Sequence, residues 1–106
     1  MCTYTSQEIF ECSRLTRQAM EREVLLSKNS LLKRIKKQYV NEVSIGIEYS
    51  EVVIESQRLW GRLMDKDCRV EAAEIESGTQ AYETTKNNCF ARKLKERSAY
   101  LDSLMK

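Results

Sequence analysis

The 106-residue sequence contains no proline, no histidine and only three glycines. Proline is the residue that most effectively ends or kinks a helix, so its absence leaves long helices uninterrupted. Histidine is the commonest side chain for general acid–base catalysis and a very common metal ligand, so its absence argues against most catalytic and metal-binding sites. The composition therefore predicts the shape of this protein more directly than its activity.

Long apolar runs are also missing. The longest aliphatic runs, at 24–26 and 52–54, are far shorter than the roughly 20 residues of a membrane-spanning helix. Residues 1–8 lack the basic and apolar regions that are typical of a secretory signal peptide. We therefore expect a protein with no membrane span and a cytoplasmic localisation.

The four cysteines, Cys2, Cys12, Cys68 and Cys89, lack the short spacings of a zinc site. Their even number allows disulfides, but no other feature of the sequence supports them. We expect free thiols that pack as small apolar residues in a reducing compartment, with no metal and no cofactor.

Apolar residues recur at three- and four-residue steps over two long segments, which is the pattern of amphipathic helices. Thr5 and Glu8 match a capping box, and this predicts the start of the first helix. Residues 43–50 alternate apolar and polar, but a lone strand would lack a partner, so we favour a turn there. Gly46 would end the first helix and Ser50 would cap the second. The predicted single domain therefore has a helix over about 5–44, a turn over about 45–50 and a helix over about 51–105.

The predicted fold class is all-α, arranged as a long antiparallel helical hairpin of coiled-coil type. The alternative is a three-helix bundle with a second break near Gly78, because Ser77 and Gln80 also match a capping box. We favour the hairpin because a single glycine inside a helix costs only about 1 kcal/mol relative to alanine. The net charges of residues 1–41, 42–76 and 77–106 are +4, −5 and +3, so the hairpin lays segments of opposite charge side by side.

The sequence contains no glycine-rich phosphate loop and no motif of a nucleophile with its base. Carboxylate pairs at helical spacing, such as Glu51 with Glu55, fit solvated helix faces. We therefore predict a protein that is not an enzyme and has no small-molecule substrate. Its partner is expected to be another protein or a second copy of the chain.

The richest apolar cluster lies in the second half of the sequence. Three consecutive aliphatic residues at 52–54 cannot all face one narrow helical seam, so part of this surface is expected to meet another element or another chain. Tryptophan and methionine are favoured at such contacts. The predicted protein interface comprises Val52, Val53, Ile54, Leu59, Trp60, Leu63 and Met64.

Two basic stretches suggest further contacts. The first is a predicted electrostatic docking site for an acidic protein surface, formed by Arg92, Lys93, Lys95 and Arg97. The second supports the alternative function of a small helical nucleic-acid-binding protein, with phosphate contacts from Lys28, Lys33, Arg34, Lys36 and Lys37. The apolar residues between these lysines divide the charges between two flanks of the helix, which favours a solvated face.

A charged antiparallel helical hairpin without catalytic residues, over about residues 5–105, resembles the central-stalk proteins of flagellar and type III secretion export ATPases. Small helical secretion chaperones are similar at this level. The resemblance is one of architecture, so it assigns no role to an individual residue. It implies a non-enzymatic adaptor or chaperone that binds other proteins of an export apparatus.

Overall fold

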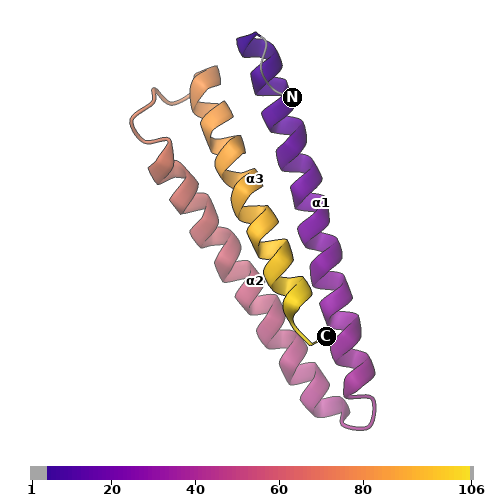
Figure 1. Ribbon diagram of the computed structural model, residues 1–106. Coiled ribbons are helices and arrows are strands. Elements are labelled where there is room, and N and C mark those ends of the chain that lie inside the picture. Colours follow the sequence, from indigo (N-terminus) through magenta and orange to yellow (C-terminus); the bar gives the residue numbers. More distant parts are fainter. Residues whose placement is uncertain (1–4, 106) are drawn as a thin grey trace.

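The computed structural model describes residues 5–105, which form three helices and no strand. They are α1 (Ser6–Gln38), α2 (Val43–Glu71) and α3 (Gln80–Ser103). Figure 1 shows α1 and α2 diverging from their shared turn, with α3 lying between them. The Cα atoms extend over 56 × 25 × 16 Å, so the molecule is an elongated and flat layer of helices. The all-α class is confirmed, and of the two expected architectures the one with three helices is observed.

Helix α1 begins where the capping box predicts. Thr5 is the N-cap, and its Oγ1 accepts a hydrogen bond from the backbone N–H of Glu8 at 3.1 Å. The Glu8 carboxylate in turn accepts from the Thr5 hydroxyl at 3.2 Å. This cap pairs one of the N–H groups that the first turn of a helix leaves without a partner.

The first turn lies earlier than predicted. The chain reverses over residues 39–42, where the N–H of Tyr39 bonds to Ile35 O and the N–H of Glu42 bonds to Tyr39 O. The turn expected over 45–50 is therefore wrong, and Gly46 and Ser50 lie inside α2. A Cβ atom on Gly46 would lie 3.1 Å from the Cβ of Tyr39. This glycine allows α2 to approach the end of α1 closely, and it does not reverse the chain.

A second break divides the helix that was expected over 51–105. Helix α2 ends at Glu71. Gly78 adopts a φ of +83°, a backbone conformation that residues other than glycine rarely adopt. Thr79 caps α3 by accepting from the N–H of Tyr82 at 3.2 Å, so Ser77 is not the cap. The break near Gly78 makes α3 run back along α2 and parallel to α1 (Figure 1).

The core lies mainly between α1 and α3, which pack more extensively than the other pairs. Small polar side chains allow these two helices to approach each other. The hydroxyls of Ser27 and Ser98 lie 2.7 Å apart, and the amide of Asn87 donates to Ser13 Oγ at 3.3 Å. Around them lies one apolar cluster, formed by Val24, Leu31, Ile35, Val53, Cys68, Cys89, Phe90, Leu94 and Leu101.

A disulfide between Cys68 and Cys89 joins α2 to α3, with a Cα–Cα distance of 5.6 Å. No cysteine within residues 5–105 is free. The expectation of free thiols is therefore wrong for Cys12, Cys68 and Cys89, while Cys2 lies outside the described residues. Their even number was the signal for a disulfide, and α3 running back along α2 is the geometry that brings these two residues together.

Candidate functional site

The predicted protein interface does not form one surface. Val53 is buried in the core, and Trp60 and Met64 are half-buried against it. The other four residues are exposed, and they are Val52, Ile54, Leu59 and Leu63. Because the molecule is a single layer of helices, α2 has two open faces, and helical spacing distributes these side chains between them. Binding at these residues stays a prediction.

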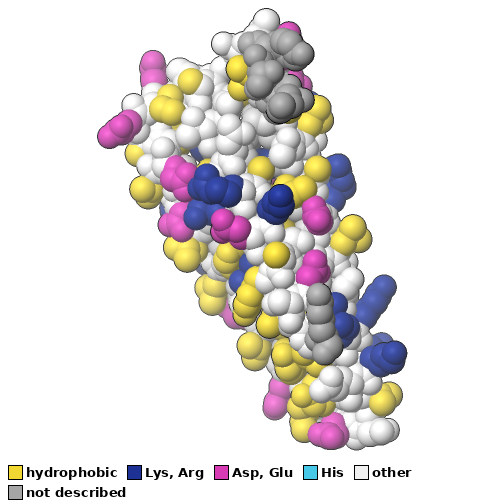
Figure 2. All heavy atoms as spheres, in the orientation of Figure 1, with side chains coloured by type: hydrophobic (Ala, Val, Ile, Leu, Met, Phe, Trp, Pro, Cys, Tyr) yellow, Lys and Arg dark blue, Asp and Glu magenta, His cyan; other side chains and the backbone are white. Residues whose placement is uncertain are grey.

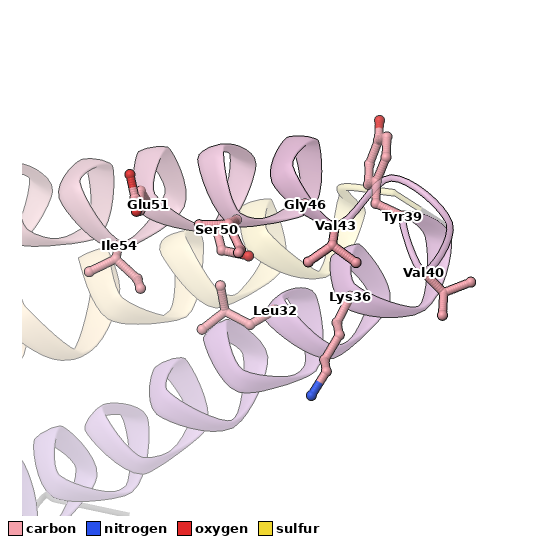
Figure 3. Close-up of a pocket in the computed structure, with 10 residues that line it drawn as sticks. Leu32, Lys36, Tyr39, Val40, Val43, Gly46, Ser50, Glu51 and Ile54 are labelled. Carbon is pink, nitrogen blue, oxygen red and sulfur yellow. The ribbon is translucent and has the colours of Figure 1, made fainter.

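One face of α2 forms a groove with the end of α1. Figure 3 shows Leu32 from α1 and Val43 and Ile54 from α2 turned toward the same space, while Lys36 extends outward from α1. The groove has a volume of about 510 Å³. We call it the turn-end groove, and it is lined by Leu32, Lys36, Tyr39, Val40, Val43, Gly46, Ile47, Ser50, Glu51 and Ile54. Sequence reasoning missed its valines because it placed a turn at residues 45–50.

The other face carries a row of exposed aliphatic side chains along most of α2. We call this row the α2 stripe, and it consists of Ile45, Val52, Leu59, Leu63 and Val70. Their exposed fractions are 46%, 67%, 52%, 60% and 73%. Figure 2 shows hydrophobic side chains gathered over α2, above all toward its shared turn with α1. Large contiguous exposed apolar surfaces mark interaction sites, whereas apolar residues exposed singly are ordinary.

The predicted docking residues on α3 are mostly engaged with α2. Arg92 Nη2 donates to both carboxylate oxygens of Glu71 at 2.7 and 2.8 Å, and this bond raises the pKa of Arg92 above its usual value. Lys93 Nζ lies 3.9 Å from a carboxylate oxygen of Asp67. Lys95 is exposed and forms no ion pair with another described residue. These contacts fasten α3 to α2, so only Lys95 is left with a fully available charge.

Arg97 also serves the fold. Its Nε donates to Gln57 Oε1 at 2.9 Å and its Nη2 to Ser56 Oγ at 3.2 Å. The guanidinium carbon lies 5.2 Å from the centre of the Trp60 ring and 4.9 Å from that of Tyr100. Partial burial lowers the pKa of Arg97 from its ordinary value. The cation is therefore enclosed between α2 and α3, where it holds the two helices together.

The basic run on α1 does not present one charged face. Arg34 donates to the carbonyl oxygens of Leu101 and Leu104, at 3.0 to 3.2 Å, and so pairs the terminal carbonyls of α3. Lys28 is half-buried, whereas Lys33, Lys36 and Lys37 are exposed. Five phosphate contacts from a single surface, as the nucleic-acid alternative requires, are not available in this arrangement.

Within residues 5–105, no cluster of three or more cysteine or acidic side chains is arranged to hold a metal ion. None of the described helices has both the length and the apolarity needed to cross a membrane. What the structure offers instead is two open apolar faces on a disulfide-linked layer of helices. The fold and these surfaces define a small helical protein of the kind that binds other proteins.

Comparison with known proteins gives the family. The family model described as "Lysozyme inhibitor LprI" matches residues 2–101, so the chain belongs to this family. The crystal structure of a DUF1311 family protein from Pseudomonas putida KT2440 is similar, with 31% sequence identity and a TM-score of 0.85. The match covers 95% of this chain and 94% of that one. No curated protein matches the sequence.

These findings correct the earlier resemblance. The predicted relation to stalk proteins of flagellar and type III secretion export systems is wrong, because the family model is that of lysozyme inhibitor LprI and the similar structure is a DUF1311 family protein. They likewise support neither a secretion chaperone nor a nucleic-acid-binding protein. The broader prediction of a helical protein that acts by binding another protein fits an inhibitor family.

Proposed function

We propose that this protein binds a lysozyme and inhibits it, and that the turn-end groove is the surface that contacts the enzyme. Membership of the lysozyme inhibitor family supports the choice of partner. Lysozymes cleave a glycosidic bond with two carboxyl groups of the enzyme that flank the bond. These carboxyl groups lie in a cleft that accepts a polysaccharide chain. An inhibitor therefore needs an element that is narrow enough to enter the cleft or broad enough to cover it.

The observation that carries the proposal is the α1–α2 end of the molecule. The helix layer as a whole is thin, since the smallest extent of its Cα atoms is 16 Å. Val40, Val43 and Ile47 are exposed at this end by 65%, 63% and 54%. Such side chains match the mainly apolar walls that ligand clefts present.

The charge at this end complements an acidic catalytic centre. Lys36 and Lys37 occupy the last turn of α1 and are exposed, and Lys36 lies at the edge of the groove. Ammonium groups placed near the catalytic carboxylates would be attracted to them and would oppose the protonation that the general acid requires. The apolar side chains then supply affinity and the lysines supply orientation.

An inhibition assay tests the proposal. Lysozyme hydrolysis of a bacterial cell-wall suspension is followed with increasing concentrations of wild type, of Val43→Asp and of Lys36→Glu. We expect inhibition by the wild type and a loss of at least about tenfold in affinity for each variant. Substitution of an anchor residue at an interface commonly reduces the binding free energy by more than about 1.4 kcal/mol, which corresponds to this factor.

The matched control is Leu26→Asp, since Leu26 is 66% exposed on α1 but does not line the groove. It should inhibit as the wild type does, and circular dichroism should give the same helix content for all variants. Absence of inhibition by the wild type would refute the function. Full inhibition by Val43→Asp and Lys36→Glu would instead refute the assigned surface.

The disulfide supports a second part of this proposal, which concerns the compartment. Disulfides persist in oxidising compartments and are rare in a reducing cytosol. The expected cytoplasmic localisation was based partly on free thiols, and the Cys68–Cys89 bond removes that basis. We therefore propose that the protein acts in an oxidising compartment, where a lysozyme also meets the cell wall. Alkylation of the protein from its native host, with and without reductant, would show Cys68 and Cys89 protected only before reduction.

A further inference from the structure

The α2 stripe has a regular sequence spacing, and its exposed aliphatic side chains do not belong to the core of the monomer. Positions 45, 49, 52, 56, 59, 63, 66 and 70 follow steps of four and three residues, which is the seam of a helix that packs on another helix. Ile45, Val52, Leu59, Leu63 and Val70 occupy five of these eight positions, and each is at least 46% exposed. From residue 45 to residue 70 this seam is roughly 40 Å long at 1.5 Å per residue.

The charges beside the seam are sorted along the helix. One flank, formed by Gly46, Val53 and Trp60, faces the core of the molecule and is closed. The other flank carries a charged residue every seven positions, and these are Glu48, Glu55, Arg62 and Arg69. The acidic pair lies in the first half of α2 and the basic pair lies in the second half.

We propose that a second copy of this chain packs antiparallel on the α2 stripe, so that the protein forms a two-fold symmetric dimer through α2. In one register Val52 faces Leu63 of the second copy and Ile45 faces Val70 of the second copy. In antiparallel helix pairs, the flanking positions that meet are then Glu48 with Arg69 and Glu55 with Arg62, each formed twice by symmetry. The same register thus pairs both the apolar and the charged residues.

The charge pattern is the reason to assign a second copy as the occupant. A two-fold interface must be complementary to itself, and a helix with acids in one half and bases in the other meets that condition only in the antiparallel direction. A parallel pair would bring the acidic halves together. In the monomer, Glu48 and Arg62 form no ion pair with other described residues, while Glu55 pairs with Arg58 and Arg69 with Asp65 inside α2. Arg62 acts on Glu55 of its own helix only at longer range, where it helps to lower the pKa of that carboxyl. The dimer therefore adds a close ion-pair partner for each of two charges that form no ion pair with the other described residues of the monomer.

Charge reversal tests both the contact and its direction. Light scattering of the wild type at high micromolar concentration should give the mass of a dimer. Arg62→Glu alone and Glu55→Arg alone should both be monomeric, because each variant places like charges against each other. An equimolar mixture of the two should form a one-to-one heterodimer, since every Glu55–Arg62 contact then joins opposite charges again.

The apolar seam is tested separately. Leu59→Glu should weaken dimerisation by about a hundredfold or more, because a charge would enter the centre of the contact. Ile54→Glu is the matched control, since Ile54 is 51% exposed on the same helix but lines the turn-end groove. This variant should dimerise as the wild type does, and circular dichroism should show unchanged helix content for both.

A monomeric wild type would overturn the proposal. So would a mixture of Arg62→Glu and Glu55→Arg that stays monomeric, or a Leu59→Glu variant that dimerises as the wild type does. The inference does not rest on lysozyme binding, because the turn-end groove lies on the opposite side of α2 from the stripe. Leu59→Glu should therefore still inhibit a lysozyme, so the failure of either proposal can be recognised without the other.

Discussion

Helix α2 is held in the molecule by different means from the α1–α3 pair. Helices α1 and α3 lie side by side and bury Phe90, Leu94 and Leu31 together with hydrogen-bonded serine and asparagine side chains. Helix α2 contacts both neighbours less extensively. It is attached by the Cys68–Cys89 disulfide near one end and by the contacts of Arg92 and Arg97 from α3.

The comparison explains why α2 carries most of the exposed aliphatic side chains. A helix fastened by a covalent bond and by guanidinium contacts needs fewer apolar residues for its own attachment. Its remaining aliphatic residues stay on open faces, where they are available for contacts with other molecules. On this interpretation, stability depends mainly on α1 and α3, while binding depends mainly on α2 and on the end of α1 beside it.

The largest expected effect tests the α1–α3 side of this comparison. Phe90 is 3% exposed, and the guanidinium carbon of Arg17 lies 3.8 Å from the centre of its ring. Phe90→Ala should lower the free energy of unfolding by about 4 kcal/mol, since it removes a buried ring and leaves a cavity. Val53→Ala on α2 should cost about half as much, in line with its smaller side chain and its place at the edge of the core. Urea denaturation measures both, and equal losses would contradict the subordinate role of α2 in stability.

The next effect concerns the attachment of α2. The bonded cysteines are 21 residues apart, and a loop of this length predicts a loss of about 3 kcal/mol when both are replaced by alanine. Hydrogen exchange should become faster over the second half of α2, while α1 and α3 keep most of their protection. A loss of protection that is confined to α2 would show that α2 opens separately from the α1–α3 pair.

The matched control for the disulfide is Arg92→Gln, which removes the exposed ion pair with Glu71 between the same two helices. Exposed pairs contribute little, so this variant should lose only a small fraction of the stability that the disulfide provides. Uniform loss of protection over all three helices in the cysteine variant would show that α2 and the α1–α3 pair unfold as one unit.

Much of the fold follows from the sequence, and the exceptions have identifiable causes. The 3.6-residue period and the Thr5 cap predicted helices and the start of α1 correctly. The first turn was placed several residues too late because Gly46 was interpreted as a chain reversal, whereas its lack of a side chain serves the contact with Tyr39. The second break is only an alternative on sequence grounds, because the cost of Gly78 in a helix is small and the pairing of Cys68 with Cys89 is a long-range property.

The candidate site was less accessible to sequence reasoning. The exposed residues Val52, Leu59 and Leu63 were in the predicted interface, but so were Val53 and Trp60, which face the core. Periodicity alone does not say which face of a helix is covered when the number of neighbouring helices is unknown. The roles of Arg34 and Arg97 were also hidden, because carbonyl groups and aromatic rings brought close by folding decide what each cation contacts.

The smallest expected effect concerns two glycines of α2, of which Gly46 lies in the first turn beside α1 and Gly61 lies in the second half of the helix. A Cβ atom on Gly61 would have no atom within 4 Å, apart from its own helix and chain neighbours. Gly61→Ala should therefore stabilise the protein by about 1 kcal/mol, because alanine favours the helix and restricts the unfolded chain. At Gly46 the same change should give no such gain, since the new Cβ would lie 3.1 Å from the Cβ of Tyr39. Thermal unfolding should show a midpoint about 5 °C higher for Gly61→Ala than for the wild type. An equal rise for Gly46→Ala would contradict this prediction, because it would mean that Tyr39 moves away from the new Cβ atom at little cost in free energy.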